Sequence, residues 1–95
     1  MSDDRKERAR LRRIATAREL EQRGMLEHAV KSYLRAGAPA EAARALASAG
    51  RLADAGAAIL ESLAVRAPAE DVAELNAEDR ALVEQAAALY AAAHE

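Results

Sequence analysis

The chain has no cysteine, tryptophan or phenylalanine, and its two tyrosines bring the aromatic fraction to only 2%. Without cysteine the protein can form neither disulfides nor cysteine-ligated zinc sites, and thiol chemistry is excluded. Val and Ile are scattered singly and no segment alternates apolar and polar residues over strand length, so we predict no β-strand. No apolar run approaches the length of a membrane span. The first residues, Met1 to Asp4, open a charged stretch without the apolar core of a signal peptide, so we expect a cytoplasmic location.

Alanine supplies most of the 52% hydrophobic content, and leucine most of the larger apolar side chains. Alanine has the highest helix propensity, and its small side chain allows helix backbones to approach closely. The 95 residues suffice for one domain. We therefore predict a single all-α domain with a thin core and marginal stability. The alanine excess, together with the predominance of arginine over lysine, is associated with bacterial sequences.

The predicted organisation has four parts within this one domain. They are a basic N-terminal helix (1–23), three short helices (24–65), a connector (66–76) and a C-terminal helix (77–95). Apolar spacing and turn residues place the helices themselves at about 3–22, 25–36, 39–49, 51–65 and 77–93. Asn76 is the expected N-cap of the last helix.

Three glycines, Gly24, Gly37 and Gly50, stand thirteen residues apart. Alanine recurs five places after each glycine, and leucine or isoleucine recurs near the ninth and tenth places, at Leu34, Leu46 and Ile59. Glycine just past a helix end adopts the left-handed conformation that satisfies the last carbonyls, so we interpret all three as structural turns and predict positive φ at Gly37 and Gly50. Helices of about ten residues are marginal alone. Short connections should therefore pack them as antiparallel hairpins, and we interpret the pattern as an internal repeat.

Each predicted helix has a stripe of apolar residues that we expect to be buried. Gly56 lies inside one of these stripes and lowers helix propensity by about 1 kcal/mol, so a close backbone contact is the expected compensation. The stripes are Leu11, Ile14, Ala15, Ala17 and Leu20; Leu26, Val30, Tyr33 and Leu34; Ala42, Leu46 and Ala49; Leu52, Ala55, Gly56, Ile59, Leu60 and Leu63; and Leu82, Val83, Ala86, Leu89, Tyr90 and Ala93.

The string Tyr33-Leu-Arg-Ala-Gly37, followed by Ala42-Ala43, resembles the helical-hairpin repeats of tetratricopeptide and clathrin-type α-solenoids. The resemblance covers residues 24–63 and is echoed weakly over residues 86–94. It implies a tetratricopeptide-like α-solenoid fragment, or a small helical bundle, with a scaffolding role and a groove that receives a peptide or helix. A full tetratricopeptide unit has about 34 residues and a tryptophan, which this chain lacks. The resemblance therefore transfers architecture and general role, and no binding residue.

No constellation of residues in the sequence supports catalysis or cofactor binding. His28 and His94 share no ligand spacing, and acidic residues at Glu70, Asp71, Glu74, Glu78 and Asp79 do not match a calcium loop. The serines lack a nucleophile-elbow context and the glycines do not form a phosphate-binding loop. We expect no enzymatic activity, no cofactor and no metal.

The charge distribution is uneven, because residues 1–23 carry a net charge of +3 and residues 24–95 a net charge of −5. The basic run suits a contact with acidic protein, on the same chain or another copy included, or with nucleic acid. A solvated helix partly neutralised by pairs such as Asp4–Arg8 is the alternative. The candidate contact residues in this run are Arg5, Arg8, Arg12 and Arg13.

The C-terminal helix carries a wide apolar face, of which one side can pack on the preceding helix. We expect the other side, with Leu89 and Tyr90, to be covered by a second copy, a partner protein or further residues. The sequence thus predicts a protein-interaction or assembly module, such as a scaffold or adaptor. The alternative is a small nucleic-acid-binding protein that uses the basic helix.

Overall fold

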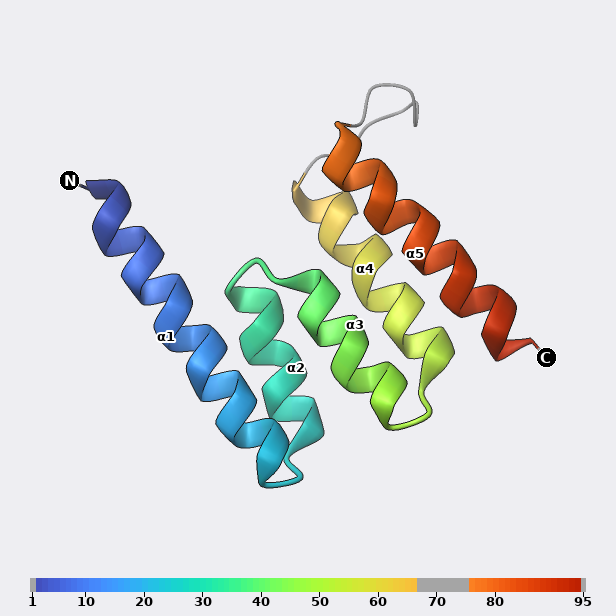
Figure 1. Cartoon of the computed structure of the whole chain (residues 1–95), viewed down its shortest axis with the longest axis horizontal. Coiled ribbons are helices and arrows are strands. Elements are labelled where there is room, and N and C mark those ends of the chain that lie inside the picture. The colour runs from blue at the N-terminus through green and yellow to red at the C-terminus, as the bar shows by residue number, and fades with distance from the viewer. Residues whose placement is uncertain (1, 67–75, 95) are drawn as a thin grey trace.

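The computed structural model describes residues 2–66 and 76–94, and in this part of the chain it contains helices and no strand. Five helices follow one another in the order α1 (Ser2–Gln22), α2 (Leu26–Arg35), α3 (Pro39–Ser48), α4 (Leu52–Arg66) and α5 (Ala77–Ala93). Each runs antiparallel to the one before it (Figure 1). The all-α prediction is confirmed, and the helix bounds agree with the predicted ranges to within one residue. Most of the predicted connector, including Glu70, Asp71 and Glu74, lies outside the described residues.

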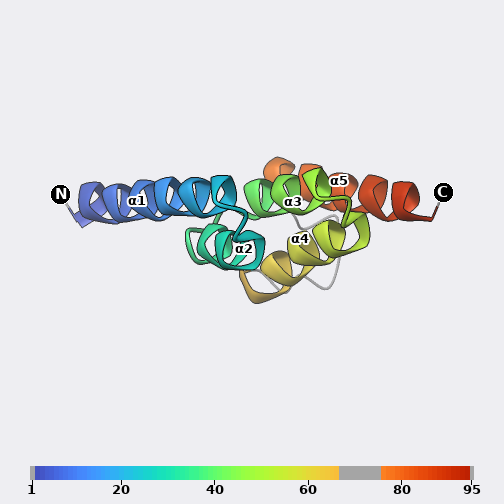
Figure 2. The ribbon, with the colours of Figure 1, turned by 90° about the horizontal axis from the view of Figure 1, so that it is seen from below.

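The helices form a flat array of two layers. Seen from its edge, α1, α3 and α5 lie in one layer and α2 and α4 in the other (Figure 2). The principal-axis extents are 37, 33 and 16 Å, so the molecule is about as thick as two helices. Each helix packs mainly on its neighbours in sequence, and α1 and α5 lie at opposite ends of the array (Figure 1).

The three glycine turns share one geometry. At Gly37, the amide of Ala38 donates to the carbonyl of Tyr33 (2.9 Å) and the amide of Gly37 donates to that of Leu34 (3.0 Å). This pair of bonds is the Schellman motif, which requires the left-handed conformation at the glycine. The same two bonds recur at Gly24 and Gly50, and φ is 80°, 71° and 81° at the three glycines. The positive φ predicted at Gly37 and Gly50 is confirmed, and Gly24 has it as well.

Equivalent positions in the three thirteen-residue units are buried alike. The alanines five places after each glycine, Ala29, Ala42 and Ala55, are all 0% exposed. Nine places after the glycines stand Tyr33, Leu46 and Ile59, which are also buried. These two positions are four residues apart, so they share one helix face. Tyr33, rather than Leu34, is therefore the residue equivalent to Leu46 and Ile59.

Several residues of the predicted stripes are exposed instead. Leu11 is 54% exposed, because residues three apart fall about 60° short of a full turn and a run of such steps winds round the helix. The run Leu11, Ile14, Ala17, Leu20 stays against α2 only in its later part. Leu60 is 41% exposed because it follows Ile59 directly and points about 100° away from the buried face of α4. The predictions that Leu11 and Leu60 are core residues are wrong, and Ala15, Ala49 and Ala93 are exposed as well.

The expected close contact at Gly56 is present between α4 and α5. A Cβ atom placed on Gly56 would lie 2.9 Å from Cε2 of Tyr90 and 3.2 Å from the carbonyl oxygen of Ala86. The missing side chain thus lets α5 approach α4 closely. The start of α5 is capped as predicted, since Oδ1 of Asn76 accepts a hydrogen bond of 2.8 Å from the amide of Asp79.

None of the described helices combines the length and the apolar character that crossing a bilayer requires.

Candidate functional site

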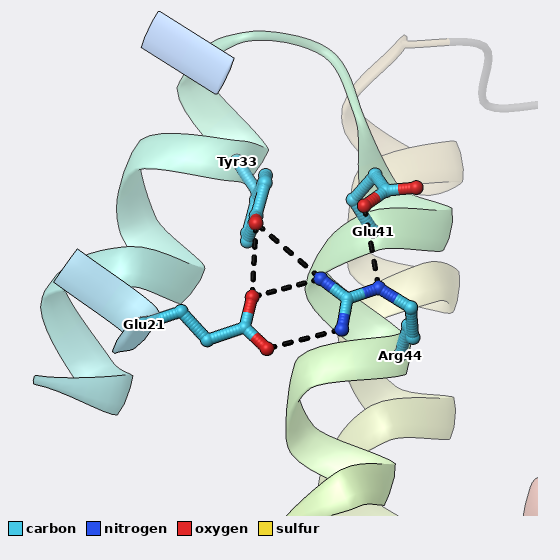
Figure 3. A network of polar contacts seen from close by, with 4 residues as sticks. All are labelled: Glu21, Tyr33, Glu41 and Arg44. Carbon is cyan, nitrogen blue, oxygen red and sulfur yellow. Dashed lines mark hydrogen bonds and ion pairs between the residues drawn. The ribbon is translucent and has the colours of Figure 1, made fainter. Parts of the chain in front are cut away.

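A polar network joins the first three helices (Figure 3). The guanidinium of Arg44 on α3 donates two hydrogen bonds to the carboxylate of Glu21 on α1, at 2.8 and 3.0 Å. The hydroxyl of Tyr33 on α2 donates to the same carboxylate at 2.9 Å and accepts from Arg44 at 3.3 Å. Arg44 also donates through Nε to Glu41 at 3.3 Å. The network therefore ties α1, α2 and α3 together.

The pKa values of these groups follow from their contacts. Hydrogen bonds from Arg44 lower the pKa of the Glu21 carboxyl, against the opposing effect of burial, and the Tyr33 hydroxyl lowers it further. Burial raises the pKa of Tyr33, as do its hydrogen bond to Glu21 and the negative charge of that carboxylate. The hydrogen bond to Glu21 raises the pKa of Arg44 above its ordinary value. Glu21 and Arg44 are thus held in their charged forms and Tyr33 in its neutral form.

A shallow hollow of about 510 Å³ lies beside this network, lined by Arg18, Glu21, Gln22, Glu41 and Arg44. Three of these five residues are already paired with one another. Within the described part of the chain, no buried side-chain nitrogen or oxygen lacks a hydrogen-bond partner. Since its charged groups are already paired with one another, we assign this network to helix packing rather than to ligand binding.

A second hollow, of about 300 Å³, is a groove between α2 and α4, with α3 beneath it. We call it the α2–α4 groove. Its apolar lining comes from all three helices: Val30 and Leu34 of α2, Leu46 of α3, and Ala57 and Ala58 of α4. Val30 and Leu34 pack against the core and yet remain half-buried rather than buried. The groove therefore leaves apolar surface open to a partner.

Charged side chains form the rim of the α2–α4 groove. At one end, Arg51 pairs with Asp54 (2.8 Å) and with Glu27 (3.6 Å), which links α2 to the start of α4. Lys31 on the α2 side and Glu61 on the α4 side also line the groove. Among the described residues, neither of these two makes an ion pair or a hydrogen bond. The groove thus offers an apolar floor between Lys31 and Glu61, whose charges no other described residue pairs.

The resemblance implied a groove, but the sequence did not show where it lies or which residues line it. It predicted Val30 and Leu34 as buried, because their spacing of four residues indicates a core-facing stripe. The residues of α4 that face them are alanines, which are too short to cover them. Two adjacent alanines, Ala57 and Ala58, opposite the larger Val30 and Leu34 are the sequence feature that indicates a groove between these helices.

The predicted contact residues of the basic helix are brought to one end of the array. Arg5, Arg8, Arg12 and Arg13 are exposed, and their side chains make no ion pair or hydrogen bond in the described part of the chain. The suggested pair Asp4–Arg8 is not formed; instead Glu7 lies 3.6 Å from Arg10. Unlike these four arginines, Arg10 is held in place by a hydrogen bond, which its Nε donates to the carbonyl of Ala36 at 3.1 Å.

The other two candidate contact residues lie at the opposite end of the array. Leu89 packs half-buried against the core, and the half-buried ring of Tyr90 covers Gly56. The larger apolar side chains of α5 thus face α4, and part of Leu89 and Tyr90 stays accessible. The basic helix α1 does not fold back over them, since it lies at the other end (Figure 1).

The histidines and acidic residues of the described ranges do not gather into one site. His28 is exposed, and Nδ1 of His94 lies 2.8 Å from the carbonyl oxygen of Tyr90 at the end of α5. In the described ranges, no three His, Cys, Asp or Glu side chains come together as a metal site.

Comparison with protein-family models, curated proteins and solved structures finds no match to this chain.

Proposed function

We propose that this chain is a non-enzymatic protein-interaction module, with a cytoplasmic scaffold or adaptor role, whose α2–α4 groove receives a helix of a partner protein. The observation that carries the proposal is the incomplete burial of Val30 and Leu34 above Leu46. An amphipathic helix in a groove buries its apolar stripe against such a floor. A tetratricopeptide-like relationship is part of the proposal, and the antiparallel two-layer array supports it (Figure 2).

The charges on the rim define the partner helix further. Lys31 on one wall and Glu61 on the other are free to pair. A helix with a leucine-sized anchor, an acidic residue towards α2 and a basic residue towards α4 complements both walls. Such rim pairs contribute mainly orientation and specificity, while the apolar anchor contributes most of the affinity.

The experiment compares two alanine-to-arginine variants as baits for co-purification from cells that produce the protein. Ala57 is half-buried in the groove, so Ala57→Arg fills it without removing a core side chain. Ala88 is exposed on α5, in the other layer, and Ala88→Arg is the matched control. We expect a partner with an amphipathic helix to bind the wild type and Ala88→Arg and to be lost from Ala57→Arg.

Two outcomes contradict this proposal. Retention of the partner by Ala57→Arg shows that the contact lies elsewhere. The second contradicting outcome is measured by light scattering of the purified chain. If the wild type self-associates and Ala57→Arg does not, a second copy rather than a different protein fills the groove.

A further inference from the structure

The N-terminal part of α1 extends beyond the helix that supports it. α1 has 21 residues and α2 has 10. The hydrogen bond from Arg10 to the carbonyl of Ala36 marks where α2 ends alongside α1. Residues 4–8, on the far side of this point, are all exposed. We call this N-terminal part of α1 the arm. Short helices without tertiary contacts are marginal in water, so a partner that contacts the arm would also stabilise it.

Three arginines form a row on the outer face of α1. Arg5, Arg8 and Arg12 are spaced by three and four residues, which places them on one side of a helix. Arg8 is about two and a half turns from Ala17, the fully buried residue of α1, so the row points away from α2. All three side chains are exposed and, among the described residues, unpaired. The row spans about 10 Å along the helix.

We propose that this arginine row binds an acidic helix of a partner protein, whose carboxylates repeat at the same three- and four-residue spacing. Arginine pairs with carboxylates through two parallel hydrogen bonds, so a matching row satisfies each guanidinium in turn. Leu11, which is 54% exposed, lies beside the row and offers an apolar contact of the kind found in protein interfaces. This surface is separate from the α2–α4 groove and goes beyond the function proposed for it.

Two observations favour protein over nucleic acid at the arginine row. The remaining residues, 24–95, carry a net charge of −5, which repels a polyanion that extends past the arm. The arm also carries no aromatic side chain on which bases can stack. Among the described helices of a second copy, none has three unpaired carboxylates on one face, so none of these helices is the partner.

The test is a nuclear magnetic resonance titration of the whole chain with two synthetic alanine-based helical peptides at low ionic strength. One peptide carries three glutamates on one face, at spacings of three and four residues, and the other carries the same residues with the glutamates spread round the helix. Three exposed ion pairs sum to about a tenfold difference in affinity, so we expect the first peptide to bind about tenfold more tightly and to shift the amides near Leu11.

The variant Arg5→Gln/Arg8→Gln/Arg12→Gln should lose about this tenfold preference. The control, Arg18→Gln/Arg23→Gln/Arg35→Gln, removes the same charge from exposed residues outside both the row and the α2–α4 groove and should keep it. Circular dichroism verifies that both variants are folded. Equal binding of the two peptides overturns the proposal, as does an equal loss in both variants. Tighter binding of a short duplex DNA than of the first peptide assigns the row to nucleic acid and also overturns it.

Discussion

At the scale of single residues, the contacts of Glu21 are the main polar link between helices that are distant in sequence. Glu21→Gln keeps the shape of the side chain and removes its charge. Hydrogen bonds to charged partners stabilise more than neutral ones, but Arg44 is partly exposed, so we expect a loss of about 1 kcal/mol in the free energy of unfolding at pH 7. Urea denaturation followed by circular dichroism measures it. Glu19→Gln, which affects only the exposed Glu19–Arg23 pair, is the control and should cost less.

The contribution of Glu21 to the free energy of unfolding depends on pH. Because the pKa of Glu21 is lowered in the folded protein, its contribution is complete above the ordinary value of 4.5 and is lost as the pH falls through the folded value. The difference between wild type and Glu21→Gln should therefore shrink in acid. A difference that is the same at pH 7 and pH 3 would show that the charge of Glu21 contributes nothing to stability.

Gly56 is a residue of α4 on which α5 packs tightly. A valine there would place Cβ against the ring of Tyr90 and the backbone of Ala86, so Gly56→Val should destabilise the fold by about 1–3 kcal/mol, in the range of overpacked cores. Ala53→Val, at an exposed position of the same helix, should cost only about 0.5 kcal/mol from propensity. Combining Gly56→Val with Tyr90→Ala removes part of the clash, and strictly additive effects in thermal denaturation would contradict the contact.

At the scale of helices and turns, Gly37 tests the repeated turn geometry. Its φ of 71° is strained for a β-branched side chain, so we expect Gly37→Val to lower the free energy of unfolding by about 1–2 kcal/mol. A Cβ atom at this position would meet nothing within 4 Å, so the cost comes from backbone strain alone. Asparagine tolerates the left-handed region, and Gly37→Asn should cost clearly less. Equal losses in chemical denaturation would remove strain as the explanation.

The two neighbouring apolar residues of α4 provide a test of which face is buried. Ile59 is 0% exposed and Leu60 is 41% exposed. Ile59→Ala should cost about 2–5 kcal/mol, since it leaves a cavity in the core, whereas Leu60→Ala should cost well below that. Equilibrium unfolding of both variants measures the difference, and a larger loss for Leu60→Ala would invert our assignment of the face.

The sequence predicted where the helices and turns lie better than it predicted which face of each helix is buried. Glycine and asparagine act on the backbone within a few residues, so the turns at Gly24, Gly37 and Gly50 and the cap at Asn76 are local properties that a sequence carries directly. Whether Leu11 or Leu60 is buried depends on where a neighbouring helix ends and on a difference of about 100° in direction. With so many alanines, the apolar pattern marks a broad stripe on each helix and leaves that direction open.

At the scale of the whole molecule, the sequential antiparallel array separates its two kinds of surface. The arginine row belongs to α1, which lies at one end of the array, and the residues that line the α2–α4 groove belong mainly to α2, α3 and α4, which lie between α1 and α5 (Figure 1). The sequence identified the first, because charge runs are visible along a chain. It could not locate the groove that the resemblance implied, because a groove between α2 and α4 arises only when α3 places these two non-consecutive helices side by side.

The most direct test of the proposed function is site-specific photo-crosslinking from the α2–α4 groove in cells that produce the protein. A photoreactive side chain at position 57 faces the groove, and one at position 88 faces solvent on the opposite layer. We predict a discrete adduct from position 57 that maps to an amphipathic helix of one partner protein, and no such adduct from position 88. An adduct from position 88 alone, or a partner that remains bound while position 57 reacts with no protein, would contradict the claim that this groove is where the module binds.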